Sequence, residues 1–135
     1  MEDAGQRLGN RIRLLLVDDE EGYVNTLAKR MARRNIEVST ALRGADGIQR
    51  LRQQEFDVAV LDLKMTDMDG IDLLRVFKMM DPKMPVIMVT GHGSERAARE
   101  GLALGAYDYL TKPCDLEELV KKIREACELG GGEHG

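Results

Sequence analysis

The stretch DVAVLDLKMTDMDGIDLL, residues 57–74, decides the fold. It opens with an apolar run, residues 58–61, that is typical of a strand buried on both faces. Asp62 follows directly, and a polar loop closed by Gly70 leads into a helical pattern that begins at Ile71. Open α/β sheets bind their ligands at the carboxyl ends of the strands. The stretch therefore predicts that Asp62 is a reactive carboxylate at such an edge.

The composition indicates one domain. The chain has 135 residues, of which 43% are hydrophobic and 33% are charged. Its net charge of −4 argues against direct nucleic-acid binding. Because we find neither a membrane span of roughly 20 apolar residues nor a signal peptide, we expect a cytoplasmic protein without a membrane partner. Cys114 and Cys127 are too few for a zinc site and are expected as reduced thiols.

Five strand patterns alternate with five helical patterns, which predicts a (βα)5 doubly wound parallel sheet. The strands are expected at 12–17, 36–40, 58–61, 86–89 and 106–110. The apolar stripes of the helices are, in chain order, Val24, Leu27, Ala28 and Met31; Ala45, Ile48 and Leu51; Ile71, Leu74, Phe77 and Met80; Ala97, Ala98, Leu102 and Leu104; and Leu116, Leu119, Val120, Ile123 and Cys127. We expect a flexible leader at 1–10, one domain at 11–128 and a flexible tail at 129–135.

Chemically distinctive residues follow four of the five strands: Asp18 and Asp19, Asp62, Thr90 and Lys112. For a single Asp after a strand, the odds that it is only a helix N-cap are about even. In a parallel sheet, however, all of these residues lie on one edge, where three carboxylates would repel one another. Since hard oxygen ligands at an open site suit Mg²⁺, the pattern predicts a magnesium site.

Four motifs extend this prediction: VDDE at 17–20, LDLKMTDMDG at 61–70, VTGHG at 89–93 and YLTKP at 109–113. Together they resemble the response-regulator receiver domain of two-component signalling, from about residue 13 to residue 127. The resemblance implies a flavodoxin-like sheet of order 2-1-3-4-5. It also implies a phosphoryl-accepting signalling domain rather than an enzyme.

The resemblance assigns a role to each residue of the site. Asp62 would accept a phosphoryl group from a sensor histidine kinase or a histidine phosphotransfer protein. Asp19, Asp62 and the backbone carbonyl of Lys64 would bind Mg²⁺ directly, and Asp18 would act through a metal-bound water. Lys112 and the metal would neutralise charge on the phosphoryl oxygens.

The resemblance also implies a switch. Thr90 would hydrogen-bond the phosphoryl group, and its movement would let the ring of Tyr109 turn inward. This pair would link the site to the face made by the fourth helix, the fifth strand and the fifth helix. The fourth helix, with Ser94 as its expected N-cap, has the weakest apolar stripe, which suits an element that shifts at low cost. The Lys112–Pro113 bond is typically cis in this family.

Some positions depart from the family pattern or vary within it. Thr66 stands where the family usually has proline, which should loosen the loop slightly. Gly91 should leave the acceptor accessible. Lys64 and His92 occupy two variable positions that influence hydrolysis of the aspartyl phosphate, so they are candidates for setting its lifetime. That both side chains point into solvent is the alternative that stays open.

Other functions fit the residues less well. A haloacid-dehalogenase-like phosphatase would need a second Asp where Lys64 stands, and an FMN carrier would need a phosphate loop where 18–20 is acidic. A receiver-like module that is not phosphorylated is disfavoured by the complete set of acceptor, metal and lysine positions. A stand-alone receiver and a piece of a longer regulator remain open, although residues 89–113 resemble receivers of sigma-54-dependent activators. The downstream partner is thus another protein or an attached output domain, and a phosphorylation-dependent dimer is also open.

Overall fold

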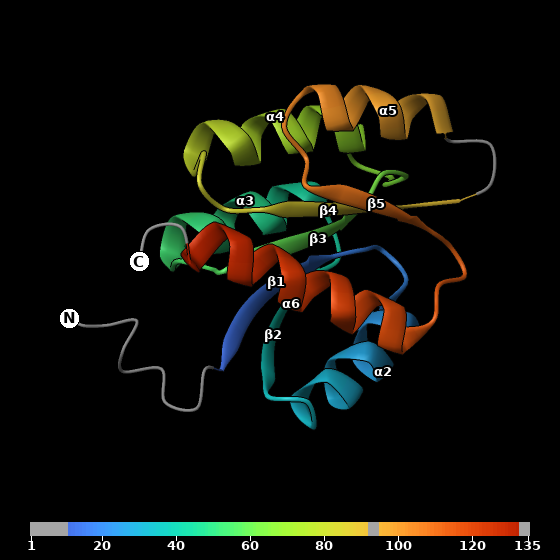
Figure 1. The fold of residues 1–135 in the computed structure, drawn as a ribbon. Coiled ribbons are helices and arrows are strands. Elements are labelled where there is room, and N and C mark those ends of the chain that lie inside the picture. Colours follow the sequence, from blue (N-terminus) through green and yellow to red (C-terminus); the bar gives the residue numbers. More distant parts are fainter. Residues whose placement is uncertain (1–10, 92–94, 133–135) are drawn as a thin grey trace.

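The computed structural model describes residues 11–91 and 95–132 (Figure 1). Five parallel strands form one sheet in the order β2-β1-β3-β4-β5, so the flavodoxin-like topology expected from the sequence is confirmed. The strands are β1 (Ile12–Val17), β2 (Ile36–Ala41), β3 (Val58–Asp62), β4 (Val86–Thr90) and β5 (Asp108–Thr111). The helices are α2 (Glu21–Ala32), α3 (Gly44–Gln53), α4 (Gly70–Met80), α5 (Glu95–Ala103) and α6 (Leu116–Gly132).

Helices cover both faces of the sheet. Figure 1 shows α2 and α6 on one face and α3, α4 and α5 on the other. Alternate residues of β1 enter two separate apolar clusters, Leu14 and Leu16 with α2 and α6, and Leu15 and Val17 with α3 and α4. All five residues of β3 are buried, as its apolar run predicts for a central strand.

The strand register brings the expected site residues to one edge. Val17 at the end of β1 pairs with Leu61 of β3, so Asp18 and Asp62 both follow from this pair. Asp62 pairs with Val89 of β4, the residue before Thr90. The strand order reverses between β1 and β3, which is where ligands bind in open α/β sheets.

The structure corrects three predictions of buried helix residues. Ala45, Met80 and Leu102 are exposed, although their spacing predicted contact with the core. Met80 and Leu102 lie in the last turns of α4 and α5, and in α5 the neighbouring Gly101 is buried against Met88 instead. In α3 the buried face is formed by Gly44 and Gly47 instead. A Cβ on Gly47 would lie 3.0 Å from Cγ2 of Val17, because this helix packs very close to β1.

The last strand also differs from the prediction. β5 begins at Asp108, two residues later than expected, and continues to Thr111. The reason is that the preceding segment closes α5, since the N–H of Ala106 donates to the carbonyl of Gly101 at 3.0 Å. Helix α6 begins directly after Asp115 and runs to Gly132, so it includes residues 129–132 of the segment expected as a tail.

Other expectations concern the ends of the chain, the cysteines and membranes. The leader 1–10, Ser94 and residues 133–135 lie outside the described residues. Cys114 and Cys127 form no disulfide within the described chain. Among the helices that the structure describes, none combines the length and apolarity that crossing a membrane requires.

Candidate functional site

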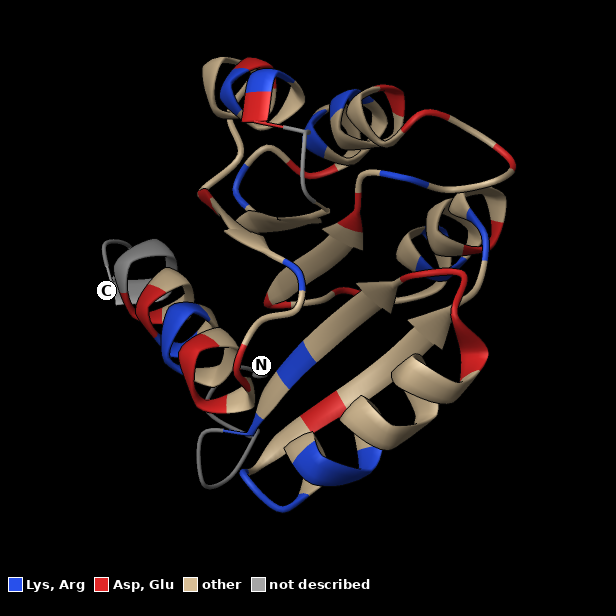
Figure 2. Cartoon of the chain, turned by 90° about the vertical axis from the view of Figure 1, so that its right-hand side faces the viewer, with Lys and Arg blue, Asp and Glu red and all other residues tan. Residues whose placement is uncertain are grey.

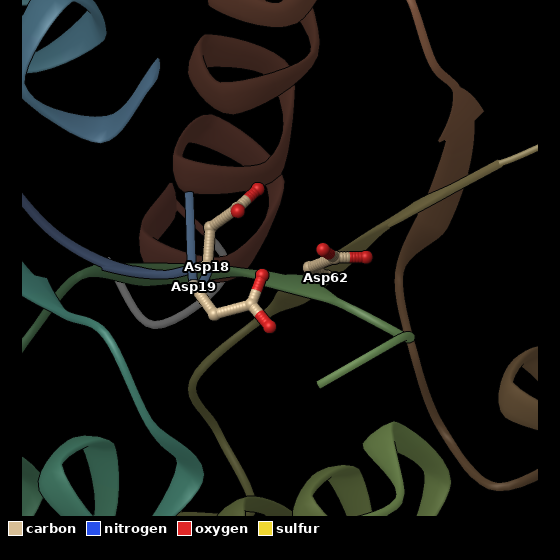
Figure 3. A group of neighbouring side chains, drawn as sticks. All are labelled: Asp18, Asp19 and Asp62. Carbon is tan, nitrogen blue, oxygen red and sulfur yellow. The ribbon is translucent and has the colours of Figure 1, made fainter. Parts of the chain in front are cut away.

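Three carboxylates meet where β1 and β3 end. One oxygen each of Asp18, Asp19 and Asp62 lies within 4.8 Å of the other two, and Figure 3 shows the side chains next to one another. Asp18 and Asp62 are almost fully buried, whereas Asp19 is half-buried. In Figure 2 acidic segments, drawn red, follow the arrowhead of β1 and end that of β3. The sequence prediction that these residues converge is confirmed.

Lys112 is the positive charge of this cluster. Its Nζ lies 2.8 Å from Oδ2 of Asp18, 3.2 Å from Oε1 of Glu20 and 3.4 Å from Oδ2 of Asp62. Its backbone N–H donates to the carbonyl of Thr90 at 2.6 Å, which fixes the end of β5 beside β4. One ammonium against four carboxylates leaves the cluster acidic, so its donor set fits a hard divalent cation such as Mg²⁺.

The surroundings raise the pKa of both Asp62 and Lys112. This shift disfavours the charged form of Asp62 and favours the charged form of Lys112. Burial raises the pKa of Asp62, although the N–H of Lys64 and the charge of Lys112 oppose this shift. Burial alone would lower the pKa of Lys112, but its hydrogen bond to Asp18 and the neighbouring negative charges raise it above the ordinary value. Lys112 therefore stays an ammonium, whereas a further positive charge near Asp62 would stabilise its ionised carboxylate.

The loop after β3 turns back on itself beside Asp62. Oδ1 of Asp62 accepts the N–H of Lys64 at 3.0 Å, and Lys64 forms an isolated antiparallel bridge with Asp69. A Cβ on Gly70 would lie 2.4 Å from Cα of Leu63, so only glycine allows the two ends of the loop to approach this closely. The backbone of Lys64 is thereby held next to the carboxylate of Asp62.

The remaining expected residues lie around this centre. Thr90 is buried at the end of β4, and Tyr109 is partly buried against the cluster formed with α3 and α4. The side chain of Lys64 is exposed, and a Cβ on Gly91 would meet no atom within 4 Å. His92 lies outside the described residues. The Lys112–Pro113 bond is cis, as the resemblance implied.

Two contacts of Lys112 were missed from the sequence. Glu20 accepts a hydrogen bond from its Nζ, and the ring of Tyr23 lies 4.8 Å from the same atom, centroid to nitrogen. Burial, together with the nearby Cys114, raises the pKa of Tyr23 to about 12. The sequence offered one signal for the second contact, because Tyr23 is an aromatic residue in the first helical turn after the acidic triplet 18–20.

The fold and this site define the class of protein. The sequence matches the response regulator receiver domain over residues 14–124, which is most of the chain. The chain therefore belongs to the receiver domain family of two-component response regulators. Domains of this family are phosphorylated on an aspartate and generally bind Mg²⁺ at an acidic pocket.

Individual relatives support this placement. The chain is 38% identical over 115 residues to the transcriptional regulatory protein GlrR of Escherichia coli K12, covering 85% of this chain but 26% of that protein. It thus spans about a quarter of that relative's length. A receiver domain protein from Clostridium thermocellum has a TM-score of 0.83 at 31% identity, covering 87% of this chain and 94% of that one. The beryllofluoride-activated NtrC4 receiver domain dimer has a TM-score of 0.82 at 33% identity, covering 87% of this chain and 98% of that one.

Proposed function

We propose that Asp62 is the phosphoryl acceptor of this receiver domain. The observation that supports this proposal is the placement of its nearly buried carboxylate at the end of β3, 3.4 Å from Nζ of Lys112 and within 4.8 Å of two further acids. A carboxylate oxygen of Asp62 would attack the phosphorus of a phosphohistidine. The new O–P bond forms as the P–N bond breaks, and the imidazole leaves with the electron pair of that bond.

Different residues of the chain would bind Mg²⁺ and compensate the charge of the phosphoryl oxygens. Asp19, Asp62 and the carbonyl of Lys64 would hold Mg²⁺, with Asp18 acting through a water. The ion would supply positive charge to the phosphoryl oxygens when bound. Lys112, already oriented by Asp18, would donate to one of these oxygens and offset its charge.

The switch would begin at Thr90. Thr90 ends the strand next to that of Asp62, and its hydroxyl would hydrogen-bond the phosphoryl group after transfer. The resulting shift would let Tyr109 turn inward and change the face of α5, β5 and α6. The half-buried state of Tyr109, between core and solvent, supports a ring that can take two positions.

Lys64 and His92 would set the lifetime of the aspartyl phosphate. Lys64 stands two residues after Asp62, and its exposed side chain would overhang the bound group. Replacing both residues by Ala and timing loss of the phosphoryl group tests this idea. We expect a change in the rate of at least about tenfold, that is about 1.4 kcal/mol in the barrier. An unchanged rate means that both side chains point into solvent.

The partners follow from the family. We infer a cytoplasmic signalling role with a sensor histidine kinase or histidine phosphotransfer protein as donor. The relatives named above are a transcriptional regulatory protein and receiver domains, one of them a dimer. They support a longer regulator, of the sigma-54-dependent activator type, whose receiver at 11–128 passes the signal to an output domain or a second copy.

The experiment is incubation with a small phosphodonor such as acetyl phosphate, with and without Mg²⁺, followed by intact-mass measurement. We expect one added phosphoryl group in the wild type with Mg²⁺ and none in Asp62→Asn. Lys112→Ala should fold but label at least about 100-fold more slowly, because the ammonium stabilises developing charge. Equal labelling of Asp62→Asn, or labelling that needs no divalent metal, contradicts the proposal.

A further inference from the structure

The loop between β3 and α4 is tied to a different helix by Asp67. Its Oδ1 accepts the N–H of Gly44 at 2.8 Å, and its Oδ2 accepts the N–H of Ala45 at 3.1 Å. These are the first two N–H groups of α3, which have no partner within a helix. Arg43 precedes α3 and offers no side-chain capping bond. The described chain thus caps α3 from a loop 23 residues further along.

Packing reinforces this link. Met68, the next residue of the loop, lies against the buried Gly44, where a Cβ would come within 2.4 Å of its Sδ. The hydrogen bonds from Gly44 and Ala45 hold the pKa of Asp67 below its ordinary value. A carboxylate at a helix N-terminus is also favoured by the helix dipole. Asp67 is therefore ionised at neutral pH and bound to α3 through both oxygens.

The same loop begins beside the proposed metal site. Lys64, three residues before Asp67, donates its N–H to Asp62, and at the far end Asp69 caps α4 by accepting the N–H of Ile71 at 2.7 Å. Between these anchors Thr66 replaces the proline usual in the family, which from the sequence should loosen the loop. Asp67 ties down the middle of the segment that lacks the proline.

We propose that Asp67 is a positioning residue for the Mg²⁺ site. By fixing the middle of the loop to the N-terminus of α3, it holds the backbone of Lys64 where its carbonyl can join Asp19 and Asp62 as a ligand. Asp67 itself touches neither metal nor phosphoryl group. The inference rests on the proposed function, because it takes the Lys64 carbonyl as a metal ligand.

The test compares three variants of the chain by Mg²⁺ titration, followed through backbone amide signals in NMR spectra. Asp67→Ala should weaken Mg²⁺ binding about tenfold, as loss of groups that orient metal ligands typically does. Asp67→Asn keeps one acceptor oxygen and should lose less affinity. Asp46→Ala is the matched control, because it removes an exposed acid from the first turn of the same helix without cutting the link. Its affinity should match the wild type.

Amide hydrogen exchange at Gly44 and Ala45 shows whether the link is cut. We expect faster exchange in Asp67→Ala together with weaker Mg²⁺ binding. Faster exchange with wild-type affinity overturns the inference, and so does an equal loss in Asp46→Ala. If Asp67→Ala does not fold, the same comparison is made with Asp67→Asn. A wild-type chain that binds no Mg²⁺ overturns the proposed function as well, so the two failures differ.

Discussion

Lys112 is the residue on which the charges of the site converge. Its ammonium group touches Asp18, Glu20 and Asp62 and lies over the face of Tyr23. Several weak restraints on one flexible side chain reduce the entropy that must be lost when it meets a phosphoryl oxygen. Lys112 is therefore already oriented within the site before any donor arrives, although the cluster as a whole stays acidic without a cation.

The raised pKa of Asp62 has a consequence for stability. Below the ordinary value of 3.8 the carboxyl is protonated both folded and unfolded. As the pH rises above that value, the unfolded chain ionises first, so the folded state loses stability until the pH passes the raised pKa. Asp62→Asn removes this cost. At pH 7 without divalent metal we therefore expect the midpoint of thermal unfolding of Asp62→Asn to lie above that of the wild type.

Thermal unfolding of both proteins between pH 3 and pH 7 checks this expectation. The two midpoints should converge at the acid end and separate with rising pH. Asp46→Asn, at an exposed position, serves as the charge control and should show no such separation. A lower midpoint for Asp62→Asn at pH 7 contradicts the burial argument.

Tyr23 offers a second test at a single residue. A cation over an aromatic face gains about 1 kcal/mol when partly desolvated, and a gain of this size that is realised only in the transition state, because the ring holds the ammonium of Lys112 in place, changes the rate roughly fivefold. Tyr23→Leu should therefore slow labelling by acetyl phosphate about fivefold, whereas Tyr23→Phe keeps the ring face and should stay within about twofold. Equal slowing in both variants would assign the effect to the hydroxyl instead.

Helix α5 is attached to the sheet by small side chains. Only Ala98 and Gly101 of this helix are buried, and its ion pair with α4, Glu100 to Arg75 at 3.8 Å, is exposed. Exposed ion pairs contribute little, so α5 depends on a small apolar contact. Helix α4 on the same face buries Leu73, Leu74 and Phe77. The difference suits the proposed switch, in which α5 would shift in response to Thr90 and Tyr109.

Amide exchange distinguishes the two helices. We expect the central amides of α5 to be protected at least about tenfold less than those of α4, and to change most on phosphorylation. The comparison is internal, because both helices cover the same face of one sheet. Equal protection in both helices would mean that α5 is not a low-cost element.

The elements also show what local sequence can predict. The apolar run of β3 predicts a central strand correctly because burial on both faces leaves little room for polar residues. The stripe of α3 misleads because Ala45 has the right spacing, while Gly47 forms the close contact with β1 and Gly44 lies against Met68. Spacing reports the period of a helix but not how closely that helix packs.

Across the whole molecule, the sheet order explains why the convergence of the acidic residues could be predicted. Residues after parallel strands share one edge, so the meeting of Asp18 and Asp62 follows from topology. The contacts of Asp67 with α3 and of Tyr23 with Lys112 were not predicted. They depend on distances between loops and helices that no local pattern encodes.

The most direct measurement is the position of the phosphoryl group. Wild-type chain treated with acetyl phosphate and Mg²⁺ is reduced with borohydride, which converts an aspartyl phosphate into homoserine, and is then mapped by peptide mass spectrometry. We expect homoserine at position 62 alone, and only when Mg²⁺ was present. Homoserine at position 18 or 19, or phosphate retained on His92, would contradict Asp62 as the acceptor.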